Sequence, residues 1–279
     1  MKLIIKFTSI ILIVISIAGC SKEKRILDLE TYLKSRCDYV HQINGFYIVS
    51  SNQKPNAMGT TSGTTAKEVF EHSVRLFSNF LDQNEDGIID TELLELSNGL
   101  SENMIFVSGH LRFVDKVSFA KSVEDNNLYA MSMQTNNWEY IKNYNGKGWK
   151  LNSLNSSTWR PDIFNALWEE TFHTITEAFS RFDNDFKFTK GSSLRNFMEA
   201  DITAGTYDIS VQNQEENGDY DKVTAVNEYI HQIWAIQFSG QEDKLNIHQK
   251  NALDFMINKK VPMTLNLNYN KTLGTRIKG

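Results

Sequence analysis

The segment WEETFHTITE, residues 168 to 177, brings two glutamates and a histidine into the spacing that a helix would hold together. Glu169 and His173 are four residues apart and would share one helix face, while Glu170 would lie about 100° from Glu169. Imidazole nitrogens and carboxylate oxygens bind divalent metal ions, and a further carboxylate can take a proton from water at the ion. The segment predicts either a metal site with a general base or a solvated helix edge.

EETFH resembles the HExxH motif of the zincin metallopeptidases, with Glu169 in place of the first histidine. In that family two histidines bind zinc and the glutamate between them activates water. The resemblance implies that Glu169 and His173 are metal ligands and that Glu170 is the catalytic general base. Because a carboxylate is a harder ligand than an imidazole, we expect zinc or another divalent transition metal.

A second segment, NEYIHQ at residues 227 to 232, resembles the one from which the gluzincin branch of the zincins takes its third ligand. The resemblance implies that Glu228 is that ligand. The residue four positions later is acidic in the family and accepts a hydrogen bond from the first histidine, but here it is Gln232. An amide can donate to a carboxylate at the first position, so Gln232 is expected to support Glu169, unless His231 does so instead.

Catalysis also needs a hydrogen-bond donor for a developing oxyanion, and Tyr207, Tyr229 and His231 are the candidates. Asp201 and Asp208 either line a cleft or cap turns. The remaining histidines stand alone and are expected to have structural or surface roles: His72, His110 and His248.

The segment LDQNEDGIIDTELLE, residues 81 to 95, is a second candidate site. Oxygen-bearing side chains occupy positions one, three, five and nine of a loop that starts at its first aspartate: Asp82, Asn84, Asp86 and Asp90. Gly87 permits a sharp turn, Ile88 would lend its backbone carbonyl, and Ile89 would face the core. Calcium takes six to eight oxygen ligands, so this register predicts a calcium site rather than an ion-free acidic turn.

The loop and its flanking segments resemble the EF-hand and its shorter relatives, such as dockerins and thrombospondin type 3 repeats. An EF-hand places a bidentate glutamate at position twelve, which is Leu93 here. The loop therefore closes onto Glu92 or Glu95, or through Asp90 as in the shorter relatives. A single loop of this kind is expected to be a structural calcium clip and not a sensor.

Periodicity predicts the elements that position these residues. Apolar residues recur at helical spacing over residues 21–40, 66–81, 91–100, 161–182, 224–240 and 243–258. Strands are expected within residues 104–114 and 126–141. The resulting prediction is a helix-dominated α+β fold, with an EF-hand-like helix-loop-helix followed by a zincin-like domain with a small sheet.

Residues 1 to 20 have two early lysines, an apolar run and small residues before Cys20, which is the layout of an export signal. The end of this segment resembles the bacterial lipobox, which implies that Cys20 carries the lipid anchor, palmitate included. The domain is then expected outside the cytoplasm, tethered to a membrane of the cell envelope. Cys37 is left without a disulfide partner.

The predicted organisation is a signal peptide over 1–20, a tether and Ser/Thr/Gly-rich linker over 21–64, the helix-loop-helix over 65–100, and the zincin-like domain over 101–279. The net charge is −5 and the basic residues are scattered, so no nucleic-acid partner is expected. The chain lacks a GxSxG elbow, a phosphate-binding loop and a CxxC pair.

Two functions are consistent with these features. The first is a membrane-anchored, calcium-binding envelope lipoprotein with a degenerate metallohydrolase site directed at peptide bonds. The alternative is a calcium-stabilised binding or structural lipoprotein without catalytic activity.

Overall fold

The computed structural model describes residues 29–50, 66–108, 129–133, 166–209, 222–237, 242–266 and 268–279. Helices predominate and one small mixed sheet accompanies them, which confirms the predicted α+β class. None of the described helices is long and apolar enough to cross a membrane. The predicted signal segment and Cys20 lie outside the described residues, as does His110.

Among the described residues, the sheet contains five strands in the order β4-β3-β2-β1-β5. Their bounds are β1 Tyr39–Ile43, β2 Phe46–Ser50, β3 Met104–Ser108, β4 Tyr129–Met133 and β5 Thr275–Lys278. β1 pairs antiparallel with both β2 and β5, whereas β2 with β3 and β3 with β4 are parallel. β3 and β4 lie within the two segments predicted to form strands.

At the centre of the sheet, β2 is buried on both faces. Phe46 and Ile48 face the main hydrophobic core, whereas Tyr47 and Val49 join a smaller cluster on the opposite face. Leu33, from the helical residues 29–36, packs in that smaller cluster. Because successive side chains of a strand point to opposite faces, the two apolar sets require cover on both sides.

The β1–β2 hairpin differs from the sequence-based organisation, which assigned residues 21–64 to a tether and linker and residues 21–40 to a helix. Only residues 29–36 of that predicted helix are described as helical, and the hairpin forms the centre of the sheet. Asn44 and Gly45 have φ angles of 47° and 89°, as a two-residue hairpin turn requires. This Asn-Gly pair between apolar runs was the overlooked hairpin signal.

The helices agree more closely with the prediction. α2 spans Ala66–Leu81, the 3-10 turn η1 spans Thr91–Leu93 and α3 spans Leu94–Asn103. The later helices are α6 Ala166–Phe182, α7 Ser193–Thr203, α8 Lys222–Ile236 and α9 Ile247–Asn258, with a 3-10 turn, η4, over Glu242–Lys244. α7 was not predicted. Ser192 caps its first turn by accepting a hydrogen bond from the Arg195 amide.

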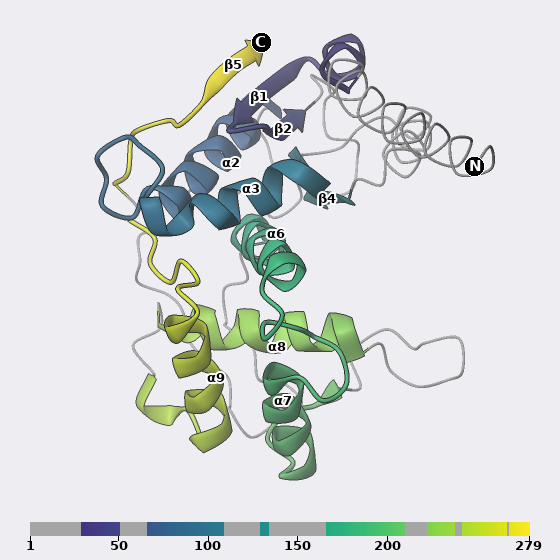
Figure 1. Ribbon diagram of the computed structural model, residues 1–279, viewed down its shortest axis with the longest axis vertical. Helices are drawn as coiled ribbons and strands as arrows, with labels where there is room; N and C mark the ends of the chain where they lie inside the picture. The colour runs from purple at the N-terminus through teal and green to yellow at the C-terminus, as the bar shows by residue number, and fades with distance from the viewer. Residues whose placement is uncertain are drawn as a thin grey trace, which may run out of the picture.

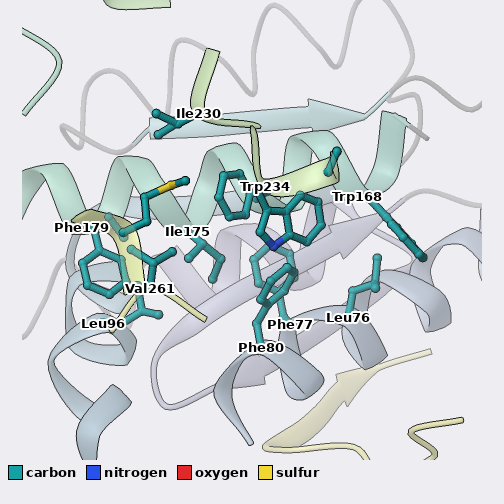
Figure 2. Packing of buried hydrophobic residues seen from close by; sticks show 14 of the residues in the cluster. Leu76, Phe77, Phe80, Leu96, Trp168, Ile175, Phe179, Ile230, Trp234 and Val261 are labelled. Atoms are coloured by element: carbon teal, nitrogen blue, oxygen red, sulfur yellow. The ribbon is translucent and has the colours of Figure 1, made fainter. Parts of the chain in front are cut away.

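α6 lies between two groups of elements (Figure 1): the sheet with α2 and α3 on one side, and α7, α8 and α9 on the other. Trp234 of α8 stacks on Phe172 of α6, with ring centroids 4.5 Å apart. Figure 2 shows Trp234 near Trp168 of α6 and Phe80 of α2. The helix-loop-helix and the following segment therefore share one continuous core instead of forming separate hydrophobic cores.

Candidate metal centre

The centre lies between α6 and α8. α6 contributes Glu169 and His173, four residues apart on one helix face, and α8 contributes Glu228 and His231. Thr176 Oγ1 donates a hydrogen bond of 2.7 Å to Asn227 Oδ1, which ties the two helices together beside the site. This hydrogen bond holds α6 and α8 together close to the place where the four side chains meet.

The four side chains offer ligand atoms that all lie within 4.8 Å of one another. His173 Nε2 is 4.0 Å from Glu228 Oε1, and His231 Nδ1 is 3.9 Å from Glu169 Oε1. Both separations exceed hydrogen-bond length, which is about 2.7–3.2 Å for N–H···O. Two ligands that each stand about 2.0–2.2 Å from one ion can have such a separation. The arrangement therefore fits a shared metal ion better than direct hydrogen bonds.

Three of the four residues are deeply buried. The side chains of Glu169, His173 and His231 are at most 10% exposed, whereas that of Glu228 is 24% exposed. His173 Nε2 is buried and has no hydrogen-bond partner among the described residues. A buried nitrogen without a partner is costly, and coordination to an ion would satisfy it.

Burial also sets the charge of the site. It lowers the pKa of His173, against an opposing effect of the nearby Glu228 carboxylate, and it lowers the pKa of His231 further. Both imidazoles are therefore neutral near pH 7, which is the form that binds metal. Two neutral imidazoles and two carboxylates match the charge of a divalent cation.

Glu170 lies beside this cluster but is not one of its four members. Burial raises the pKa of Glu170 to about 7, and the negative charge of Glu228 contributes to the increase. A carboxylate whose pKa is close to neutral can exchange a proton during a reaction, as a general base must. The three predicted ligands and the predicted base are thus brought to one place.

His231 is the member whose role the sequence did not indicate. The sequence predicted His231 as support for Glu169 or as an oxyanion donor, yet one of its ring nitrogens is among the four clustered ligand atoms. One signal was present: Glu228 and His231 repeat on α8 the three-residue spacing of Glu170 and His173 on α6. Both pairs place a carboxylate and an imidazole on neighbouring positions of one helix face.

The two tyrosines predicted as oxyanion donors, Tyr207 and Tyr229, donate their hydroxyl hydrogen bonds to other protein groups. Tyr229 donates a hydrogen bond of 2.6 Å to Asp201, and Tyr207 donates one of 3.3 Å to the Ala225 carbonyl. Asp201 is fully buried and also accepts a hydrogen bond from Thr206. Asn246, the capping residue of α9, donates a further hydrogen bond to Asp201, so this carboxylate links α7 to α8 and to α9.

His72 and His248 are not members of the cluster. His72 borders a small pocket together with Trp168 and Tyr269, and burial lowers its pKa to about 4. His248 lies in the first turn of α9, where its backbone amide donates to the capping residue Asn246.

Residues 82–90, which we call the acidic loop, form a compact turn between α2 and η1. Asp82 Oδ1 accepts a hydrogen bond from the Asp86 amide, and Asp82 Oδ2 accepts one from the Gly87 amide, each 2.9 Å long. Gly87 has φ of 91°, the left-handed conformation for which glycine was expected here. Asn84 accepts from the Asp86 amide, and Asp86 in turn accepts from the Ile88 amide.

The end of the loop closes on Asp90 and not on a later glutamate. Asp90 is 7% exposed, and its Oδ2 accepts a hydrogen bond of 2.8 Å from the Gln83 amide. Its Oδ1 is buried without a hydrogen-bond partner among the described residues. Glu92 and Glu95 are both exposed. Of the predicted alternatives, closure through Asp90 fits this arrangement best.

Ile89 packs against the main core, as predicted for position eight, while Ile88 is 67% exposed. The three loop aspartates are less tightly gathered than the centre between α6 and α8. Within the described residues, that centre is the one group with three or more histidine or carboxylate ligand atoms within 4.8 Å.

No family model matches the chain, and neither a curated protein nor a solved structure matches it.

Proposed function

We propose that this chain is an envelope lipoprotein with a buried divalent-metal centre that hydrolyses peptide-like bonds. The observation that carries the proposal is the convergence of Glu169, His173 and Glu228, together with His231, between α6 and α8. The chain contains four residues able to hold zinc or another divalent transition metal, with a general-base candidate beside them.

The proposed chemistry assigns one role to each group. A bound ion would supply Lewis-acid activation of water and of the substrate carbonyl. Glu170 would accept a proton from that water and later return it to the leaving group. Glu228 is the most exposed of the four ligands, so substrate would approach from its side.

We propose a second, structural role for the acidic loop as a calcium clip between α2 and η1. The support is the buried Asp90 Oδ1, which lacks a hydrogen-bond partner among the described residues, next to the buried Asp82. An oxygen ligand in this position needs a cation or a donor, and calcium is bound through such oxygens. The ligands we assign to it are Asp82, Asn84, Asp86, the Ile88 carbonyl and Asp90.

The envelope location rests on the lipobox-like end of residues 1–20. If Cys20 is lipidated, palmitate labelling in bacterial cells should be lost in a Cys20→Ser variant and kept in a Cys37→Ser variant. Equal labelling of the two variants would contradict the proposal of a lipid anchor.

Elemental mass spectrometry on the purified chain tests the two metal roles together. A Glu169→Ala/His173→Ala variant should lose a transition metal and keep calcium, and an Asp82→Ala/Asp86→Ala variant should do the reverse. Circular dichroism would establish that each variant is folded.

The second candidate function is a calcium-stabilised binding or structural lipoprotein. It is favoured by a contact between the acidic loop and a residue near the C-terminus. Tyr269 donates a hydrogen bond of 2.8 Å to Asp82. If the wild-type chain contains calcium alone, and no transition metal can be loaded, this second function replaces the hydrolase.

A further inference from the structure

We infer that His231 is a fourth metal ligand and that it commits the centre to an ion with five or six coordination positions, such as Mn²⁺, Fe²⁺ or Co²⁺. The inference rests on the proposed metal centre and names the class of ion that it takes. The zincin resemblance does not imply this ligand, because the ligand that it assigns on α8 is Glu228 and not a histidine.

The geometry supports His231 as a ligand of the same ion as the other three residues. Its Nδ1 is 3.9 Å from Glu169 Oε1, nearly the same separation as the 4.0 Å between His173 Nε2 and Glu228 Oε1. The two pairs cross between the helices, so each helix gives one imidazole and one carboxylate. An ion between the helices would therefore have ligands of both kinds from both sides.

The His231 ring is held in place by its surroundings. Its centroid lies 6.2 Å from that of Phe172 and 5.9 Å from that of Trp234, and the His173 ring stands edge-on at 5.4 Å. His231 is 1% exposed. Because these rings fill the space around it, the imidazole cannot turn away to leave a three-ligand site without repacking of the core.

Four protein ligands have a consequence for the ion. Zinc sites with four protein ligands are closed and structural, whereas catalytic zinc sites use three protein ligands and keep one position for water. With His231 bound, a tetrahedral ion would have no position left for water. An ion with five or six positions keeps at least one, and the partial exposure of Glu228 places solvent on that side of the site.

The donor set is compatible with the same class of ion. Two carboxylates and two imidazoles combine hard oxygen and intermediate nitrogen ligands, a combination suited to manganese, iron and cobalt as well as to zinc. The two carboxylate charges also balance a divalent ion inside a buried site, where an uncompensated charge would be costly.

Cobalt provides the direct test, since its visible absorption is intense in tetrahedral sites and weak in five- or six-coordinate ones. The full chain would be stripped of metal with a chelator and titrated separately with Co²⁺, Mn²⁺ and Zn²⁺. We expect one Co²⁺ per chain at this centre, with the weak absorption of the higher coordination numbers. The Asp82→Ala/Asp86→Ala variant would remove any contribution from the acidic loop.

A His231→Gln variant removes one ligand at nearly the same side-chain size. It should weaken Mn²⁺ binding at least about tenfold, the lower end of what loss of a supporting metal-site residue costs, and weaken Zn²⁺ binding less. Bound Co²⁺ should gain absorption as the coordination number falls. His248→Gln on α9 is the matched control and should change none of these values.

The outcomes separate this inference from the proposed function. Intense tetrahedral absorption in the wild-type chain would overturn the inference, whatever the variant does. So would unchanged Mn²⁺ affinity in His231→Gln alongside lost binding in His173→Gln, because the centre would then exist without His231 as a ligand. If the wild-type chain binds none of the three ions at the centre, the proposed function fails as well.

Discussion

At the residue scale, the proposed site assigns metal binding to the four cluster residues and proton transfer to Glu170. Glu169, His173, Glu228 and His231 offer ligand atoms that meet between two helices, while Glu170 stays outside the cluster. Its pKa of about 7 arises mainly from burial, with Glu228 as the second cause. Removing the charge of Glu170 should therefore affect proton transfer without removing a ligand.

We predict that Glu170→Gln keeps the transition metal and lowers hydrolysis of a peptide mixture by about 10²–10⁴-fold, the usual contribution of a general base. Product peptides would be measured by mass spectrometry alongside metal content. Glu177→Gln, on the same helix but paired with Arg181, is the control and should retain activity. Undiminished hydrolysis in Glu170→Gln would remove this residue from the mechanism.

At the element scale, the acidic loop is joined to a segment almost two hundred residues later in the chain. Tyr269 donates to Asp82, Lys271 donates to the Glu85 carbonyl, and Asn266 donates to the Glu85 carboxylate. Beyond this segment the chain continues into β5, which pairs with β1 at the edge of the sheet. The C-terminal segment therefore links the loop to the sheet.

We predict that Tyr269→Phe destabilises the protein by about 1.5–3 kcal/mol, because the lost hydrogen bond is buried and ends on a carboxylate. Urea unfolding monitored by circular dichroism would measure the change. Tyr47→Phe is a useful comparison, since its hydroxyl bond to Glu30 is 3.3 Å long and only partly buried, so its loss should cost less. Equal stability of Tyr269→Phe and the wild type would mean that this bond does not stabilise the fold.

At the scale of the whole molecule, buried neutral histidines couple stability to pH. Burial, with a smaller contribution from the positive charge of Arg75, lowers the pKa of His72 from 6.5 to about 4. Between these values the unfolded chain binds a proton that the folded chain does not. His72 therefore favours unfolding as pH falls from about 6.5 to about 4, while above pH 6.5 this effect is absent.

We predict that wild type loses about 3 kcal/mol more stability than His72→Gln over that pH interval. The free energy of unfolding would be measured at several pH values for both proteins without metal. The prediction fails if the His72→Gln and wild-type curves remain parallel from pH 6.5 to pH 4.

Most helices were predictable because their signals are local. The apolar spacing of residues 66–81 gave the observed bounds of α2, and the register of Asp82, Gly87 and Ile89 anticipated the turn that they form. The β1–β2 hairpin was also encoded locally in Asn44-Gly45 but was overlooked. Its position in the centre of the sheet was not encoded locally, since β3 and β5 come from distant parts of the chain.

By itself, the sequence determined that Glu169 and His173 share a helix face and that Glu228 and His231 lie near each other on another helix, because helical spacing is set within a few residues. Only the tertiary structure decided that the two pairs meet. Their meeting depends on how α6 packs against α8, through contacts such as Phe172 with Trp234 and Thr176 with Asn227. Such contacts between distant residues are selected by the packing of the whole core, which no single segment specifies.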